Sequence, residues 1–135
     1  MIIPSLLVIL AVFQAAIRSS IFFLTLLHAA FFSFALYATY FDFTHSLLIN
    51  SIFCLFLAQY CSKNYDTLLA GVYIGLQFIA VLNYFCMAVF YSFLTEFYTQ
   101  AITLYNSLND MLIILNIAVL VGMTDGGSWL RNYVK

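Results

Sequence analysis

Long apolar runs alternate with short polar breaks along the chain, and the longest of these runs lies at 67–95. It contains no proline and no charged residue, and Asp66 and Glu96 bound it. A helix crosses the roughly 30 Å hydrocarbon layer of a bilayer in about 20 residues. The run is therefore longer than a crossing needs, and we predict a tilted membrane-spanning helix there.

Four further apolar runs accompany it, at 2–17, 21–41, 47–61 and 101–123. In the breaks, Arg18 and Asp42 lie 24 residues apart, which is about 36 Å of helix and therefore one crossing. We predict an all-α, polytopic integral membrane protein, with one domain, about five transmembrane helices and no sizeable extramembrane part. A four-span version stays open, in which 3–40 forms one long or kinked helix or the first run lies along the membrane surface.

The composition supports this class. Hydrophobic residues make up 66% of the 135 residues and charged residues only 7%, whereas soluble domains carry roughly 25% charged residues. A water-soluble surface cannot be built from this set, so the lipid bilayer is the first predicted partner. The net charge of −1 and the absence of a basic run from the sequence exclude electrostatic binding of nucleic acid.

The few charges also predict an orientation. Lysine and arginine accumulate in loops on the cytoplasmic or matrix side of a membrane. With five crossings, the acidic Asp42 and Glu96 fall on one side, and the basic residues fall on the other: Arg18, Lys63, Arg131 and Lys135. We therefore predict an inner membrane, mitochondrial or bacterial, with the N-terminus outside and the C-terminus on the cytoplasmic or matrix side.

Asp110 is the main candidate for a functional charge. The strongly apolar stretch 111–123 spans only about 20 Å as a helix, so the last crossing must recruit residues from one side. If it recruits 101–109, Asp110 lies inside the membrane, where carboxylates commonly belong to proton or ion paths. If it recruits 124–130, Asp110 lies at the boundary and 96–110 forms an amphipathic interfacial helix. Arg18 is the only basic residue that could approach an embedded Asp110.

Two further pairs of residues in 67–95 attract attention. Gly71 and Gly75 form a GxxxG motif, whose small face lets another helix approach closely, either within the chain or from a partner. Gln77 and Asn83 are uncharged polar residues, which favour interhelical hydrogen bonds worth around 1 kcal/mol. A polar pathway through the membrane is the alternative interpretation of these two side chains.

Nothing in the sequence indicates an enzyme. It contains no nucleophile–base motif, no glycine-rich phosphate loop and no paired catalytic carboxylates. His28 and His45 lack any spacing that would link them as haem or metal ligands, and we interpret the three cysteines as small hydrophobic residues. We predict no metal site and no cofactor.

Five spans with the N-terminus outside, together with Tyr73-Ile74-Gly75, resemble the small sixth membrane subunit of mitochondrial complex I and its Tyr-Val-Gly motif. That family carries the motif in its third span and has an asparagine–proline loop. Here the motif lies in the fourth run and the loop is absent from the sequence, so no functional residue is carried over.

Three functions fit these features. The first is a small non-catalytic subunit of a multi-subunit membrane complex, with a respiratory or organelle-type energy-converting assembly favoured, which acts by packing against other transmembrane subunits. The second is a self-associating pore-former that resembles a phage holin. The third is a compact proton or ion transporter that uses Asp110, with Arg18, Gln77 and Asn83 as further path candidates.

Overall fold

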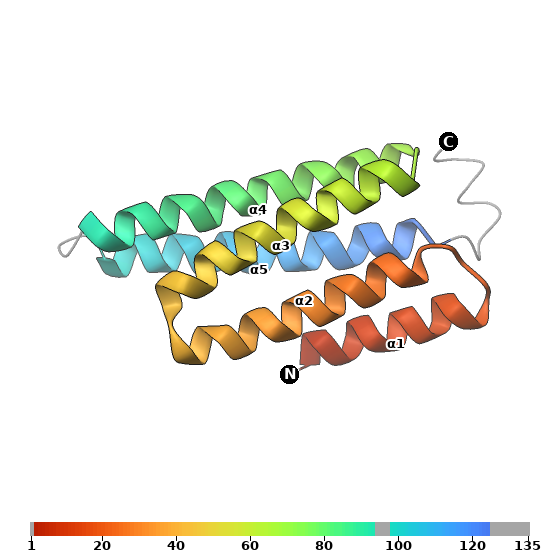
Figure 1. The fold of residues 1–135 in the computed structure, drawn as a ribbon, viewed down its shortest axis with the longest axis horizontal. Coiled ribbons are helices and arrows are strands. Elements are labelled where there is room, and N and C mark those ends of the chain that lie inside the picture. Colours follow the sequence, from red (N-terminus) through yellow and green to blue (C-terminus); the bar gives the residue numbers. More distant parts are fainter. Residues whose placement is uncertain (1, 94–97, 125–135) are drawn as a thin grey trace.

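The computed structural model describes residues 2–93 and 98–124, which form helices joined by short turns (Figure 1). The five helices of this part of the chain are α1 (Ile2–Ala16), α2 (Phe22–Phe41), α3 (Phe43–Asn64), α4 (Leu68–Phe93) and α5 (Tyr98–Gly122). No strand occurs in these residues. The predicted all-α class is confirmed.

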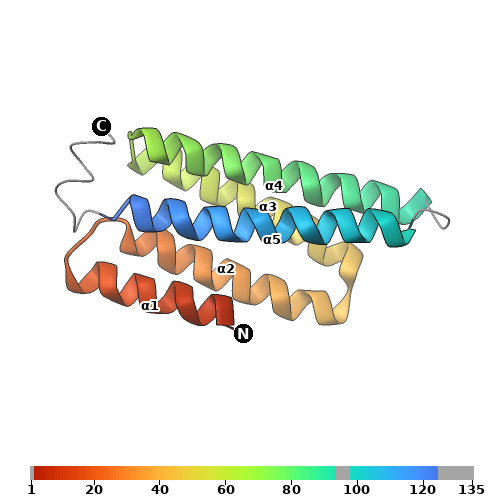
Figure 2. The ribbon, with the colours of Figure 1, turned by 180° about the vertical axis from the view of Figure 1, so that it is seen from behind.

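The helices form an elongated bundle in which consecutive helices run antiparallel. Figures 1 and 2 show α3, α4 and α5 side by side, with the hairpin of α1 and α2 along one flank. The Tyr65 hydroxyl donates a hydrogen bond to the Ser20 carbonyl oxygen at 2.7 Å and so joins the α1–α2 and α3–α4 turns at one end of the bundle. Arg18 and Lys63 lie at this end, whereas Asp42 lies at the opposite end. Glu96, Arg131 and Lys135 fall outside the described residues.

Local signals explain where α1 stops. The Ser19 N–H donates to the Gln14 carbonyl oxygen at 2.8 Å and the Arg18 N–H donates to that of Ala15 at 3.0 Å. Arg18 has a φ of 59°, so these two hydrogen bonds form a left-handed C-terminal cap of the Schellman type. A continuous helix over 3–40 is therefore not formed, and this form of the four-span version is wrong.

Side-chain caps begin two later helices. The Asp42 carboxylate accepts a hydrogen bond from the His45 N–H at 3.2 Å at the start of α3, and the Thr67 hydroxyl accepts one from the Ala70 N–H at 3.1 Å at the start of α4. Such caps satisfy backbone N–H groups that have no partner within the helix. Asp42 also pairs with the ring of His45, which is a surface contact.

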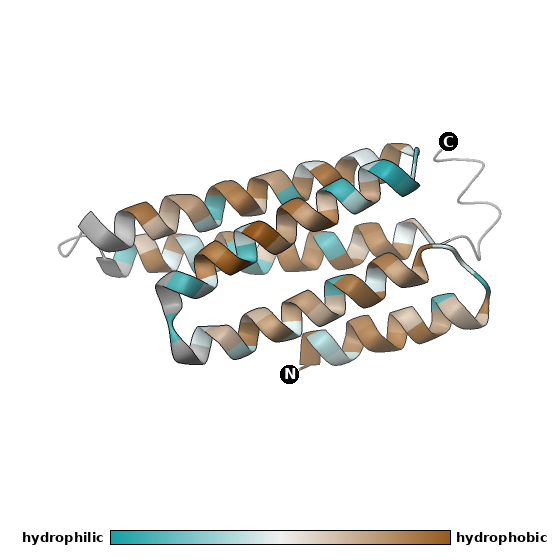
Figure 3. Ribbon diagram, viewed as in Figure 1, coloured by the Kyte–Doolittle hydropathy of each residue, from teal (hydrophilic) through white to brown (hydrophobic). Residues whose placement is uncertain are grey.

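The bundle buries a narrow core and exposes most of its apolar surface. Leu24, Tyr73 and Leu120 are completely buried, but large apolar side chains such as Leu68 and Leu104 are more than 70% exposed. Figure 3 shows hydrophobic positions along the length of all helices, with hydrophilic positions at the turns and scattered along the helices. Surface of this kind suits hydrocarbon as the solvent.

Four of the described helices are long and apolar enough to cross a membrane, namely α2, α3, α4 and α5. Helix α1 has 15 residues, which is only about 22 Å of helix. The apolar length of the bundle thus supports an integral membrane protein with four long spans and a shorter α1 packed beside α2.

Candidate functional site

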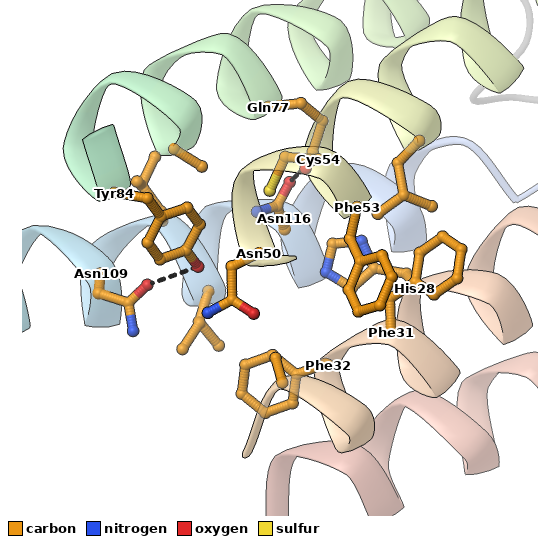
Figure 4. Close-up of a pocket in the computed structure, with 15 residues that line it drawn as sticks. His28, Phe31, Phe32, Asn50, Phe53, Cys54, Gln77, Tyr84, Asn109 and Asn116 are labelled. Carbon is orange, nitrogen blue, oxygen red and sulfur yellow. Dashed lines mark hydrogen bonds between the residues drawn. The ribbon is translucent and has the colours of Figure 1, made fainter. Parts of the chain in front are cut away.

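Polar side chains from different helices meet inside the bundle. The Gln77 side-chain amide on α4 donates a hydrogen bond to the Asn116 side-chain oxygen on α5 at 2.7 Å. The Tyr84 hydroxyl on α4 donates to the side-chain oxygen of Asn109 on α5 at 3.1 Å (Figure 4). The Asn83 side chain donates to a backbone oxygen of α5 at 3.4 Å. Gln77 and Asn83 therefore make the interhelical hydrogen bonds that the packing interpretation predicts.

The Gln77–Asn116 and Tyr84–Asn109 hydrogen bonds border a small cavity of about 50 Å³ between α2, α3, α4 and α5. Asn50 projects into it from α3, between Phe32 on one side and Tyr84 and Asn109 on the other (Figure 4). The side-chain oxygen of Asn50 is buried and has no hydrogen-bond partner among the described residues. A cavity of this size has room for a few water molecules, which need polar neighbours of this kind.

A larger groove of about 430 Å³ adjoins this cavity and opens to the outside of the bundle. Its walls are the first turn of α1, the second half of α2 and the first half of α5, with Asn50, Tyr84 and Asn109 shared between groove and cavity. The polar side chains that line the groove are Thr39, Asn50, Tyr84, Tyr105, Asn106, Asn109 and Asp110. This polar groove is the candidate functional site.

Asp110 occupies the middle of α5, twelve residues after Tyr98 and twelve before Gly122. Helix α5 is continuous through this point, so 98–110 does not form a separate interfacial helix. The stretch of α5 that is long and apolar enough to cross a membrane, Gln100–Gly122, includes the residues before Asp110, which favours the first of the two sequence alternatives. Asn106, Asn109 and Asp110 lie on one face because residues three and four apart are neighbours on a helix.

The bundle leaves Asp110 exposed. The only ion pair among the described residues joins Asp42 and His45 at the end of the bundle. Arg18 does not approach Asp110, since it follows the end of α1, where Gln14 contacts Leu120 on α5 at 3.2 Å. Leu120 lies ten residues beyond Asp110, which is about 15 Å along the helix.

Gln14 has a structural role that sequence reasoning did not assign. Its side-chain amide donates to the carbonyl oxygen of Leu120 at 3.2 Å and to the hydroxyl of Thr124 at 2.9 Å, and Gln14 is completely buried. These bonds hold the end of α1 against the end of α5. A single amide within an otherwise apolar run was the available signal, because such a group needs a partner in a low-polarity environment.

Gly71 and Gly75 do not serve close packing against the helices of the described residues. A methyl group added at either position would meet no atom within 4 Å. By contrast, a methyl group on Gly122 would lie 3.0 Å from Leu69 of α4. The GxxxG face of α4 is therefore open, and the glycine that permits a close helix approach within the bundle is a different one.

The two histidines lie apart. The Nδ1 atom of His28 is hydrogen-bonded to the hydroxyl of Tyr73 at 2.7 Å in the core, which links α2 to α4. His45 lies at the exposed start of α3 beside Asp42. Within 2–93 and 98–124, no three histidine, cysteine or acidic residues gather into a group that could hold a metal ion.

The fold and the groove together define an all-α polytopic membrane protein with a polar, open site at the middle of α5. No protein-family model matches the chain, and no curated protein or solved structure matches it either.

Proposed function

We propose that the chain is a small non-catalytic subunit of a multi-subunit membrane complex and acts by packing its helices against other transmembrane helices. The single observation that carries this proposal is the exposure of Asp110 at the middle of α5. An inner-membrane, energy-converting assembly is the setting that we favour, because the chain combines very high hydrophobicity with few charges.

The energetic reason is the cost of a carboxylate in lipid. An aspartate at the centre of a transmembrane helix costs about 2.5–3.5 kcal/mol on insertion scales. Such groups normally face other helices or a water-filled cavity and pair with another polar group. Within the described part of this chain, Asp110 lines an open groove without an ion pair. A partner that covers the groove would offset that cost.

The open GxxxG face on α4 supports the same proposal. Gly71 and Gly75 leave space next to the α4 backbone, and small residues at this spacing allow close contact between helices in lipid. The chain thus has two separate surfaces suited to neighbouring helices.

Asp110→Asn tests the proposal. The tagged full-length chain would be purified from its native membranes in mild detergent, and the mass and composition of the particle would be measured by native mass spectrometry. We expect one copy of the wild-type chain with several different membrane proteins, and at least a roughly tenfold loss of that particle in Asp110→Asn. Asp66→Asn, the same chemical change in the exposed α3–α4 turn, is the matched control and should assemble normally.

Two outcomes contradict the proposal. Recovery of the wild-type chain as a monomer would show that Asp110 does not require a partner that covers the groove. Recovery as a homo-oligomer would instead favour the self-associating pore-former.

A proton or ion path is the second candidate, and the continuity between groove and cavity favours it. The polar lining runs from Asp110 past Asn109 and Tyr84 to Asn50 inside the bundle. This candidate predicts that the purified chain in liposomes conducts protons under an applied potential and that Asp110→Asn abolishes the flux. Wild-type flux no larger than that of protein-free liposomes excludes it.

A further inference from the structure

We infer that the groove binds a partner transmembrane helix that carries a lysine or arginine near the middle of the bilayer and pairs it with Asp110. This inference rests on the proposed function and names the chemistry of the partner. It follows from the depth of Asp110, the two different walls of the groove and the location of this chain's own basic residues.

The walls of the groove fit a helix with one polar position. On the α2 side, Phe32, Ala35 and Leu36 provide apolar surface, against which leucine or alanine side chains of a helix would pack. On the α5 side, Asn106 and Asp110 provide polar groups. A helix lying between these walls would pack most of its contact surface against α2. It would need only one polar side chain, directed toward α5.

Charge determines which polar side chain is favoured. A carboxylate accepts hydrogen bonds but donates none, whereas lysine and arginine only donate. Charged groups inside a membrane pair with one another because each lowers the cost of embedding the other. A basic side chain opposite Asp110 therefore suits the site better than a neutral or acidic one.

A second copy of this chain could not supply such a group at that depth. Arg18 and Lys63 lie in or next to the turns at one end of the bundle, about half a bilayer away from the middle of α5. The other two basic residues, Arg131 and Lys135, follow the end of α5 in the sequence. The partner must therefore be a different polypeptide.

Synthetic transmembrane peptides test this inference directly. Three leucine–alanine helices of equal length would carry a central lysine, leucine or glutamate, and each would be mixed with the labelled full-length chain in phosphatidylcholine vesicles. Association would be measured by energy transfer. We expect the lysine peptide to bind the wild-type chain about tenfold more tightly than the leucine peptide, and the glutamate peptide to bind no better than leucine.

Variants of the chain locate the effect. Asp110→Asn should reduce the preference for lysine to less than about twofold, while Asp66→Asn should leave it unchanged. A peptide with its lysine moved two helical turns toward one end should also lose the preference, because the lysine then lies about 11 Å from the level of Asp110. Ala35→Phe adds a bulky side chain to the α2 wall and so narrows the groove, but it keeps the Asp110 carboxylate. This variant should weaken binding of the lysine peptide.

Three results would overturn the inference. Equal binding of the lysine and leucine peptides to the wild-type chain would show that Asp110 does not select a partner helix with a basic side chain. An unchanged preference in Asp110→Asn would assign the selection to another site. Energy transfer between copies of the chain that Asp110→Asn abolishes would assign the groove to a second copy. In the first two cases, a hetero-complex recovered from native membranes would leave the proposed function standing.

Discussion

Tyr73→Ala is expected to lower the free energy of unfolding by about 3–5 kcal/mol, the range for truncating a buried aromatic residue. Tyr73 on α4 is completely buried and is the largest side chain buried to this degree among the described residues. Its removal would leave a cavity and would deprive His28 of its 2.7 Å hydrogen bond. Close packing matters in lipid because dispersion contacts replace much of the hydrophobic driving force.

Tyr73→Phe separates the two contributions. It removes the hydroxyl and keeps the ring, so we expect a loss of only about 1 kcal/mol, as for other interhelical hydrogen bonds in membranes. Both variants would be measured by reversible unfolding in bicelles. A cost below 1 kcal/mol for Tyr73→Ala would show that the core does not pack around this ring.

Asp110→Leu is expected to make insertion of α5 more favourable by about 3–4 kcal/mol, which is the difference between the two residues at a helix centre. The isolated segment 98–122 would be fused to a reporter with two glycosylation sites, and the inserted fraction would be measured. A glutamate at the same position should insert about as poorly as aspartate. No change with leucine would mean that position 110 stays in water.

The same substitution should prevent assembly. The chain would gain a helix that is more stable in lipid and would lose the charge that a partner recognises, so Asp110→Leu should be abundant in the membrane but absent from the complex. A gain in local stability with a loss of function is typical of residues retained for a site rather than for the fold. Reduced abundance together with normal assembly would contradict the account.

The helices could be predicted because their signals are local. The run 21–41 corresponds closely to α2 (Phe22–Phe41), since apolar length and flanking polar residues act on the same segment. The polar stretch at 42–46, which separates the predicted runs 21–41 and 47–61, does not form a loop. Helix α3 already begins at Phe43. Asp42 caps this helix, so Thr44, His45 and Ser46 continue it despite their polarity.

The groove could be predicted only in part. The sequence identifies Asp110, but its exposure depends on which helices pack beside α5, and no local pattern encodes this arrangement. Asn50 and Asn106 were missed for the same reason, because the face that a polar residue presents is set by tertiary packing. Gly71 and Gly75 show the converse, since a methyl group added at either glycine of this packing motif would meet no atom of the described residues within 4 Å.

The depth of position 110 in the bilayer is the most direct test of the claim that Asp110 lies inside the membrane and needs a partner. The three native cysteines would be replaced by alanine, and a nitroxide would be attached to a single new cysteine, either at Lys63 or at Met111, the exposed neighbour of Asp110. The accessibility of each label to oxygen and to a polar nickel complex would then be measured in bilayers. We predict that the label at 111 lies near the bilayer centre, roughly 15 Å deeper than the label at 63. Equal, headgroup-level depth at both positions would place Asp110 in water and remove the reason for a partner.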